Sequence, residues 1–272
     1  MRLRPVDAAF ATLILLVPCP LPAHAGQPEG ARTASPHEYT VAIRPAVWIV
    51  FVDGEIADEG PTGNAVQVSL DDDLGFNDPY PSFLGEANLR LGGYDFWITG
   101  MLLNEIETTD IDVTFNIDDT IFDFGLTVKA SVDINDINFR YGYSPFSFEE
   151  DGFRLGPTIA VSYTKLDFKV TELESGMSES LTEEFPVPTV GIHGEIPIDN
   201  IILIGSISGF YFKANNFEGT GLRTNINITW RPLENFGIFA GINAIFADLT
   251  IKDTDIDDVL LWGPFAGVEL RF

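Results

Sequence analysis

Apolar and polar residues alternate with a period of two along most of this chain. The final segment, residues 259–272, shows the pattern clearly when one counts back from its last residue. One face is apolar: Phe272, Leu270, Val268, Ala266, Pro264 and Trp262. The other face is polar or small, with one aromatic exception: Arg271, Glu269, Gly267, Phe265 and Gly263. A period of two is typical of a β-strand whose two faces meet different surroundings.

Ten segments follow this pattern, and turn residues separate them. They begin near Tyr39, Phe83, Phe96, Ile121, Phe153, Val190, Ile201, Leu222, Phe236 and Val259. The fourth segment changes the parity of its apolar face between Ile134 and Ile137, which predicts a β-bulge near Asn135. The sequence therefore predicts an all-β chain of about ten antiparallel strands. The count falls to eight if the weak segment 201–213 and one neighbour are not strands.

The connections between these segments alternate in length. Turns near residues 92, 148, 198 and 233 are short, whereas 53–81, 104–127, 172–185, 214–220 and 252–258 are mostly longer. This rhythm is typical of a closed up-and-down transmembrane β-barrel, with short turns at one end and longer loops at the other. A water-soluble β-sandwich would also alternate, but it would not need ten segments in this rhythm. Because hydrocarbon satisfies no backbone group, the last strand is expected to pair with the first.

The start of the chain has a different character. Arg2 and Arg4 precede an apolar stretch from Ala8 to Pro22, and residues 23–25 form a small-x-small cleavage site. Residues 1–25 are therefore predicted to be a secretory signal peptide. A lipoprotein signal at Cys19 is the alternative, although its proline neighbours do not fit. Residues 26–38 are predicted to be a flexible lead-in, and residues 39–272 the barrel.

Composition narrows the classes of function. The formal net charge is -26, with 41 acidic and 15 basic residues, which argues against a nucleic-acid partner. The single cysteine lies in the predicted signal peptide, so we expect neither a disulfide nor a thiolate metal site. No apolar run reaches about 18 residues, but spanning strands need only about 9–11. No cofactor is expected.

These features together resemble the small outer-membrane β-barrel proteins of Gram-negative bacteria. The likeness rests on the signal peptide, the alternating strands, the turn rhythm and the terminal aromatic residue. It implies that Phe272, Leu270 and Val268 form an assembly signal for the barrel-assembly machinery. It also implies a location in the outer membrane, among its lipid and lipopolysaccharide. An aspartate-rich first loop containing D-L-G-F is similar to uncharacterised proteins of this kind.

Charged residues of both signs are predicted to point into the barrel. They are Arg44, Glu86, Arg90, Arg140, Arg154, His193, Glu195, Arg223, Arg231, Glu269 and Arg271. Buried charges must be paired or hydrated, so one interpretation is a salt-bridged interior in a narrow, filled barrel. The alternative is a narrow anion-preferring pore for small solutes, since rings of arginine can select anions.

The predicted outer loops are acidic. Asp71, Asp72, Asp73 and Asp78 lie in a first loop without a basic residue. A solvated, self-repelling surface is the plain interpretation. A divalent-cation site is the alternative, because carboxylates are hard ligands, although the run lacks the alternate spacing of an EF-hand loop.

Histidine limits the scope for catalysis. Only His193 falls within the predicted barrel, with Glu195 two residues later on the same face. Such a pair could orient a base in a lipid- or peptide-hydrolysing barrel enzyme. A structural histidine is preferred, because His193 falls toward the short-turn end. The sequence thus favours a non-enzymatic barrel that contributes to envelope structure or surface interaction.

Overall fold

The computed structural model describes residues 39–59, 65–111, 114–117, 120–122, 125–147, 152–214, 217–251 and 254–272. Nearly all of these residues are in β-strands, and they belong to one compact unit, Tyr39–Phe272. The predicted signal peptide and lead-in lie outside the described residues. Within the described part of the chain, no helix has the length and apolar character needed to cross a membrane.

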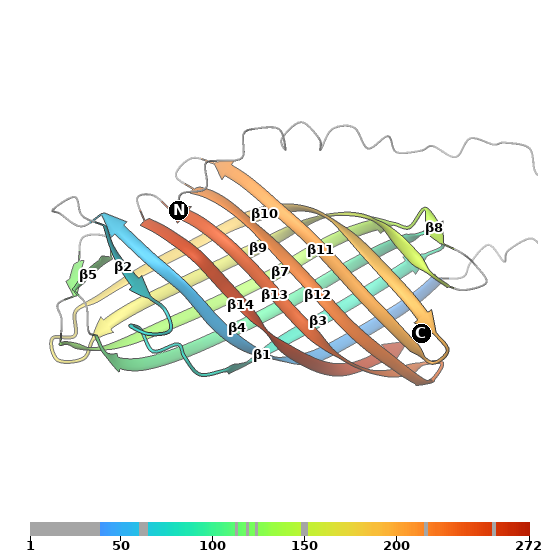
Figure 1. Cartoon of the computed structure of the whole chain (residues 1–272), viewed down its shortest axis with the longest axis horizontal. Helices are drawn as coiled ribbons and strands as arrows, with labels where there is room; N and C mark the ends of the chain where they lie inside the picture. Colours follow the sequence, from blue (N-terminus) through green and yellow to red (C-terminus); the bar gives the residue numbers. More distant parts are fainter. Residues whose placement is uncertain are drawn as a thin grey trace, which may run out of the picture. The chain divides into compact units, whose positions relative to one another are not determined.

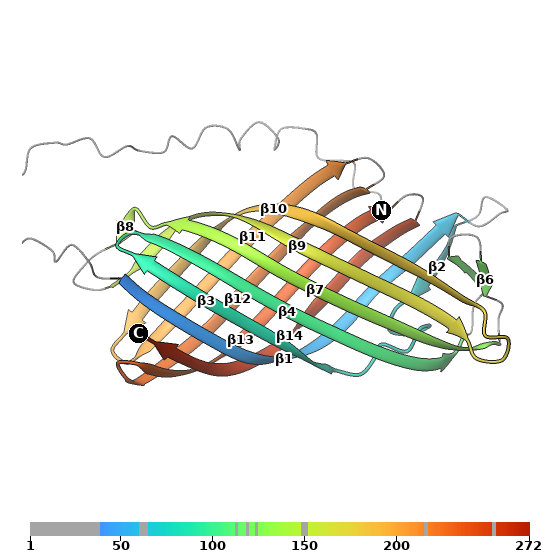
Figure 2. The same cartoon turned by 180° about the vertical axis from the view of Figure 1, so that it is seen from behind.

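Ten long antiparallel strands form the wall of a closed barrel (Figures 1 and 2). They are β1 (Tyr39–Glu59), β3 (Tyr80–Leu91), β4 (Tyr94–Asp110), β7 (Thr127–Tyr143), β9 (Arg154–Glu172), β10 (Ser178–Ile198), β11 (Ile201–Ala214), β12 (Phe217–Leu233), β13 (Phe236–Ile251) and β14 (Thr254–Arg271). The shorter strands are β2 (Ala65–Ser69), β5 (Phe115–Ile117), β6 (Thr120–Phe122) and β8 (Phe146–Ser147). The predicted fold class and the count of ten are confirmed.

The barrel closes where the chain's last strand meets its first. β14 pairs with β1 from Ala42↔Arg271 to Asp58↔Thr254. The backbone N–H of Phe272 donates to the carbonyl of Val41 at 2.9 Å, and the N–H of Val41 donates back at 3.1 Å. Closure satisfies the two edge strands, as expected for a wall that cannot leave backbone groups bare in hydrocarbon.

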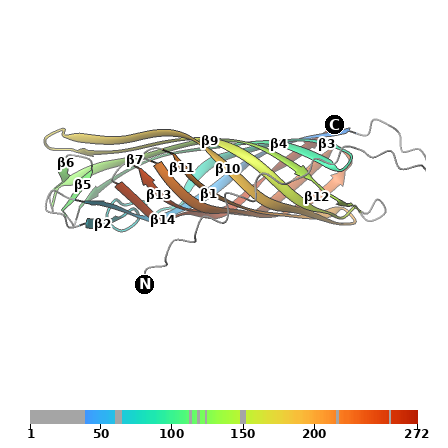
Figure 3. The same ribbon diagram turned by 90° about the horizontal axis from the view of Figure 1, so that it is seen from above.

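The two ends of the barrel differ. We call the end with β2, β5 and β6 the loop end, and the end with β8 and the chain's C-terminus the turn end (Figures 1 and 3). Turns at Gly92 and Asp199 are tight, and both residues have the positive φ that such turns require. The connection predicted at residues 144–152 includes the short strand β8, which pairs with the start of β9.

Three loops predicted at the loop end are mostly strand instead. Segment 172–185 contributes its second half to β10, and β11 is separated from β12 by only residues 215–216. β13 is likewise separated from β14 by only residues 252–253. The strands are longer than a bilayer core requires. Polar residues with the composition of loops therefore belong to strands that continue past the apolar part of the barrel's outer surface.

The inner and outer faces exchange character along the barrel axis. On β9 the outward residues are apolar from Leu155 to Tyr163, whereas the outward positions from Lys165 to Thr171 are polar. The inward residues do the reverse. They are polar or small near the turn end and become apolar at Leu166, Phe168 and Val170. Nine residues of exposed apolar strand match the span of about 9–11 that a bilayer core requires.

The same exchange corrects the predicted bulge at Asn135. β7 pairs without a register shift with both β4 and β9 across this position. Asp136 is buried and Ile137 is 49% exposed, whereas Val132 is buried further along the strand. The parity of the apolar face changes because the surroundings of the wall change, not because a residue is inserted.

An apolar core fills the loop-end half of the barrel. Its largest fully buried members include Trp48, Leu74, Phe76 and Leu103. Leu74 and Phe76 come from the aspartate-rich loop after β2, and both are essentially inaccessible to solvent. This loop therefore inserts its D-L-G-F apolar residues into the barrel instead of standing out in solvent.

Candidate functional site: the polar interior

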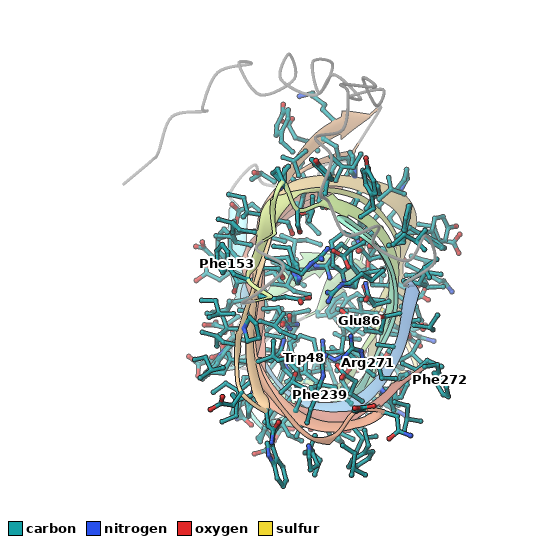
Figure 4. All side chains as sticks on the ribbon, turned by 90° about the vertical axis from the view of Figure 1, so that its right-hand side faces the viewer. Trp48, Glu86, Phe153, Phe239, Arg271 and Phe272 are labelled. Atoms are coloured by element: carbon teal, nitrogen blue, oxygen red, sulfur yellow. The ribbon has the colours of Figure 1, made fainter. Side chains whose placement is uncertain are left out.

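The turn-end half of the barrel encloses a polar cavity of about 120 Å³. Viewed along the axis, Glu86, Trp48, Phe239 and Arg271 lie inside the wall, and Phe272 lies outside it (Figure 4). All the interior residues predicted from the sequence line this cavity except Arg154, which is buried beside it. The period-two alternation of the sequence was therefore enough to predict that these side chains point into the barrel.

Arg44 is the centre of the first group of ion pairs. Its guanidinium contacts Glu86 at 3.1 Å and Glu269 at 3.5 Å, and it donates to Asn227 at 2.9 Å. Arg231 donates two hydrogen bonds to the Glu269 carboxylate, at 2.6 and 3.1 Å. Glu269 is only 2% exposed, so its charge depends on these two arginines.

Two aromatic rings support the arginines of this group. The Arg44 guanidinium lies 4.2 Å from the centroid of Phe239, and Arg140 lies 4.4 Å from that of Trp97. Arg140 also approaches Glu86 at 3.5 Å, so one carboxylate serves two arginines. Cation–π contacts of this kind hold a guanidinium where carboxylates are scarce.

Asp95 is the centre of the second group. It is fully buried on β4 and pairs with Arg90 at 2.8 Å and Arg154 at 2.6 Å. Arg90 reaches across to Glu195 at 2.5 Å. Asp95 was not among the residues predicted from the sequence, although it shares the inward parity of Trp97.

Asp136 is the centre of the third group. It accepts bonds from Thr164 at 2.7 Å and from Arg223 at 3.1 Å. Asp136 was not among the residues predicted from the sequence, although it shares the inward parity of Arg140. Asn138 and Ser162 are bonded to each other at 2.8 Å and continue this polar lining.

Positive charge exceeds negative charge in and beside the turn-end cavity. Seven arginines face five carboxylates there: Arg44, Arg90, Arg140, Arg154, Arg223, Arg231 and Arg271 against Glu86, Asp95, Asp136, Glu195 and Glu269. Arg271 makes no ion pair within the described residues. The Nε atoms of Arg44, Arg140 and Arg154 are buried without a hydrogen bond. The cavity has room for water molecules that could satisfy such groups.

His193 is held as part of this network. Its Nε2 lies 3.2 Å from Glu195, and its ring packs edge-on against Trp97 with centroids 4.8 Å apart. Ser206 stands opposite His193 in the β10–β11 ladder, but Nδ1 of His193 has no hydrogen-bond partner. The described geometry brings His193 and Glu195 together and forms no bond between a serine and the histidine.

The bore is closed on the loop-end side of this cavity. Leu84, Met101, Ile245 and Phe265 line that side, and Trp48 beyond them is fully buried with its indole N–H on the carbonyl of Gly263 at 3.0 Å. Phe265, the one aromatic exception on the polar face of the last segment, belongs to this closure. The described interior is therefore a polar chamber beneath an apolar core.

The predicted aspartate cluster forms a turn at the loop end. Asp73 accepts the backbone N–H of Ser69 at 2.8 Å, and Asp71 accepts the Ser69 hydroxyl. Asp72 and Asp78 are exposed. Within the described residues, no three acidic, histidine or cysteine side chains gather closely enough to hold a metal ion. The divalent-cation site stays a prediction.

Another acidic pair faces inward near the loop end of β4. Glu105 and Glu107 share the inward parity of Leu103, and Tyr80 donates its hydroxyl to Glu107 at 2.9 Å. Burial, together with the neighbouring Glu107 carboxylate, raises the pKa of Glu105 above its ordinary value. This pair lies beyond the apolar zone of the wall.

Comparisons with known proteins bear on the fold. No family model matches the chain, and no curated protein sequence matches it. Its structure is similar to the outer membrane protease OmpT of Escherichia coli, with a TM-score of 0.51 and 11% identity over 86% of this chain and 97% of that one.

Two further solved structures are similar at lower TM-scores. The attachment invasion locus protein Ail of Yersinia pestis gives 0.37, at 12% identity over 87% of this chain and 100% of that one. Neisserial surface protein A gives 0.32, at 10% identity over 86% and 97%. The likeness to OmpT concerns the fold alone. The chain has the fold of the outer-membrane β-barrel proteins.

Proposed function

We propose that this protein is a non-enzymatic outer-membrane β-barrel that contributes to envelope structure or surface interaction through its loop end. In this proposal the loop end is extracellular and the turn end is periplasmic. The barrel is a filled scaffold and not a conduit. The observation that carries the proposal is the apolar core that closes the bore above the polar chamber.

The outer surface supports placement in a membrane. Outward residues of the apolar zone, such as Ile226 at 60% and Ile242 at 58% exposed, would be unfavourable in water but not in hydrocarbon. Aromatic residues border this zone. Near the turn end, the ring centroids of Tyr94 and Tyr143 are 5.0 Å apart. Near the loop end, Phe51 stacks on Trp262 with centroids 4.9 Å apart. Such girdles are typical of the two membrane interfaces.

The interior supports a scaffold. In the turn-end half each of the five carboxylates is paired with at least one arginine, which ties strands far apart in sequence to one another. In the loop-end half Val50, Val128 and Val170 are fully buried from three different strands. Apolar side chains that pack together inside the barrel support a filled scaffold.

The loop end supports a role at the cell surface. β9 and β10 have 19 and 21 residues, which is about twice what a bilayer core requires. Their outward side chains beyond the apolar zone include Asp167, Lys169 and Glu184. An ordered, acidic rim would therefore stand above the membrane, where divalent cations could bridge it to anionic headgroups of lipopolysaccharide.

Single-channel conductance of the refolded barrel in a planar bilayer tests this proposal. In potassium chloride we expect no steady conductance steps, with or without millimolar calcium on the loop-end side. Insertion is verified independently by protease protection of the spanning strands. Steady steps with anion preference would overturn the scaffold in favour of the narrow anion pore, for which the surplus of interior arginine is the supporting observation.

A further inference from the structure

One pair of neighbouring strands is joined over only part of its length. The β10–β11 ladder runs from Ile198↔Ile201 to Val190↔Gly209 and ends there. The β9–β10 ladder continues to Ser178↔Thr171, and the β11–β12 ladder to Ala214↔Phe217. Both strands thus extend toward the loop end without a shared ladder. The arrowhead of β11 stands away from the rest of the wall (Figures 1 and 4).

We call this gap the β10–β11 seam, and define it by Phe185–Thr189 on β10 and Phe210–Lys213 on β11. Pro186 and Pro188 lie within it. Both are also rungs of the continuous β9–β10 ladder, opposite Tyr163 and Val161. Because proline has no N–H to donate, these rungs must direct their nitrogens away from β9, toward β11. Two backbone N–H donors that could extend the β10–β11 ladder are therefore missing. The two prolines thus prevent this ladder from continuing toward the loop end.

Aromatic side chains close the seam where backbone bonds do not. Phe185 of β10 stacks on Phe212 of β11 with centroids 5.8 Å apart, and Phe212 lies 6.1 Å from Phe210. Glycines of β12 make room for these rings. A Cβ on Gly221 would approach the Phe210 ring to 2.4 Å, and one on Gly219 would approach the Phe212 ring to 3.0 Å.

The seam begins inside the apolar zone of the wall. Ile192 of β10 and Ile207 of β11 are 52% and 48% exposed just below it. Tyr211, which is 53% exposed, lies on the seam's own level, and Lys213 beyond it is held by Glu218. The outward positions at its start are Pro188 and Pro186. In the proposed membrane placement, Pro188 and Pro186 lie opposite Val161 and Tyr163, the last outward apolar residues of β9, so the gap starts at the outer-leaflet edge of the hydrocarbon.

We propose that the β10–β11 seam is a lateral opening at which an acyl chain of an outer-leaflet lipid enters by separating the stacked rings of Phe185 and Phe212. The opening starts at the edge of the hydrocarbon, and most of its inward lining is apolar, with Phe185, Val187, Phe210 and Phe212 beside the single polar residue Thr189. A β-strand of another protein is a poorer occupant, because the proline positions offer it no donors. This inference rests on the proposed placement in the outer membrane but not on the absence of conductance.

The test is photo-labelling of the wild-type barrel in phosphatidylcholine vesicles whose lipid carries a diazirine near the end of one acyl chain. Adducts are mapped by mass spectrometry of peptides. We expect adducts on the inward seam residues Phe185, Phe210 and Phe212, in addition to the outward Ile192 and Ile207. The inward controls Val170 and Val128, whose strands pair on both sides without a register shift, should carry none.

A covalent closure provides the matched control. The only cysteine of the chain, Cys19, lies in the predicted signal peptide, so a Val187→Cys/Phe212→Cys pair can be oxidised without competition. These positions would face each other if the ladder continued. Oxidation should remove the seam adducts, and reduction of the same preparation should restore them. Pro186→Thr/Pro188→Thr, which restores two donors, should lower seam labelling several-fold and leave labelling at Ile192 unchanged.

The outcomes separate the two proposals. Adducts on the outward Ile192 and Ile207 without adducts on the seam residues would overturn the lateral opening and leave the membrane placement intact. Equal labelling of Val170, Val128 and the seam would mean a loosely packed core and would also overturn it. A barrel without adducts at Ile192 and Ile207 would contradict the placement itself.

Discussion

At the scale of single residues, the charges of the interior are shared and not matched one to one. Glu269 serves Arg231 and Arg44, Asp95 serves Arg90 and Arg154, and Glu86 serves Arg44 and Arg140. Removing one buried carboxylate therefore leaves two arginines short of a partner. Such a loss is more costly than the net worth of the ion pair, because the remaining charges stay buried.

Glu269→Gln should lower the free energy of unfolding by about 3–5 kcal/mol, since a neutral amide cannot balance Arg231 and Arg44 in a buried site. Urea titration of the barrel in lipid vesicles, followed by tryptophan fluorescence, measures this. Glu234→Gln is the control, because Glu234 lies exposed in the β12–β13 turn. Equal unfolding midpoints for the two variants would show that the interior pairs do not stabilise the barrel.

At the scale of strands, each long strand passes through two environments. Its outward side chains are apolar in the membrane zone and polar beyond it, and its inward side chains do the opposite. A substitution of one chemical kind should therefore have different effects at two outward positions of the wall. The controlling variable is height along the barrel axis and not the direction of the side chain.

Ile226→Arg should destabilise the barrel by about 2–4 kcal/mol, because the cation would sit in hydrocarbon. Thr182→Arg, on an outward and exposed position of β10 beyond the apolar zone, should change stability little. Folding yield and urea midpoints in vesicles give both values. A comparable loss for Thr182→Arg would show that the membrane extends further along β10 than the exchange of faces indicates.

At the scale of the whole molecule, closure depends on the last strand. Phe272 is 73% exposed on the outer surface, yet its backbone completes two bonds with Val41. Its side chain thus adds little packing within the barrel, while its backbone helps to join the ends of the wall. This separation lets a role in assembly be distinguished from a role in stability.

Phe272→Ala should reduce the amount of barrel in the outer membrane of cells, whereas refolding of the purified chain into vesicles should stay close to wild type. The physical reason is that the ring is exposed and free to be recognised, while the backbone bonds survive the change. Heat-modifiable migration of the folded barrel in gels measures both. A parallel loss in cells and in vesicles would mean that the ring stabilises the closed barrel directly.

The sequence by itself determined the wall. Period-two alternation is a local property, so ten strands, their inward and outward faces and the closure of β14 on β1 could all be predicted. The inward direction of Arg44, Arg90, His193 and Glu269 followed from the same parity. Backbone groups with no partner in hydrocarbon then left a closed barrel as the fold.

Only the tertiary structure decided what lies within the wall. Arg90 and Glu195 are 105 residues apart, and strand register alone brings them to one height. The parity change in β7 has the same sequence signature as a bulge, and only the pairing of its neighbours shows a change of surroundings. Leu74 and Phe76 enter the core from a loop that is acidic by composition. The seam likewise depends on where the β10–β11 ladder ends. Pairing involves two strands at once, so the sequence of either strand alone does not show where it ends.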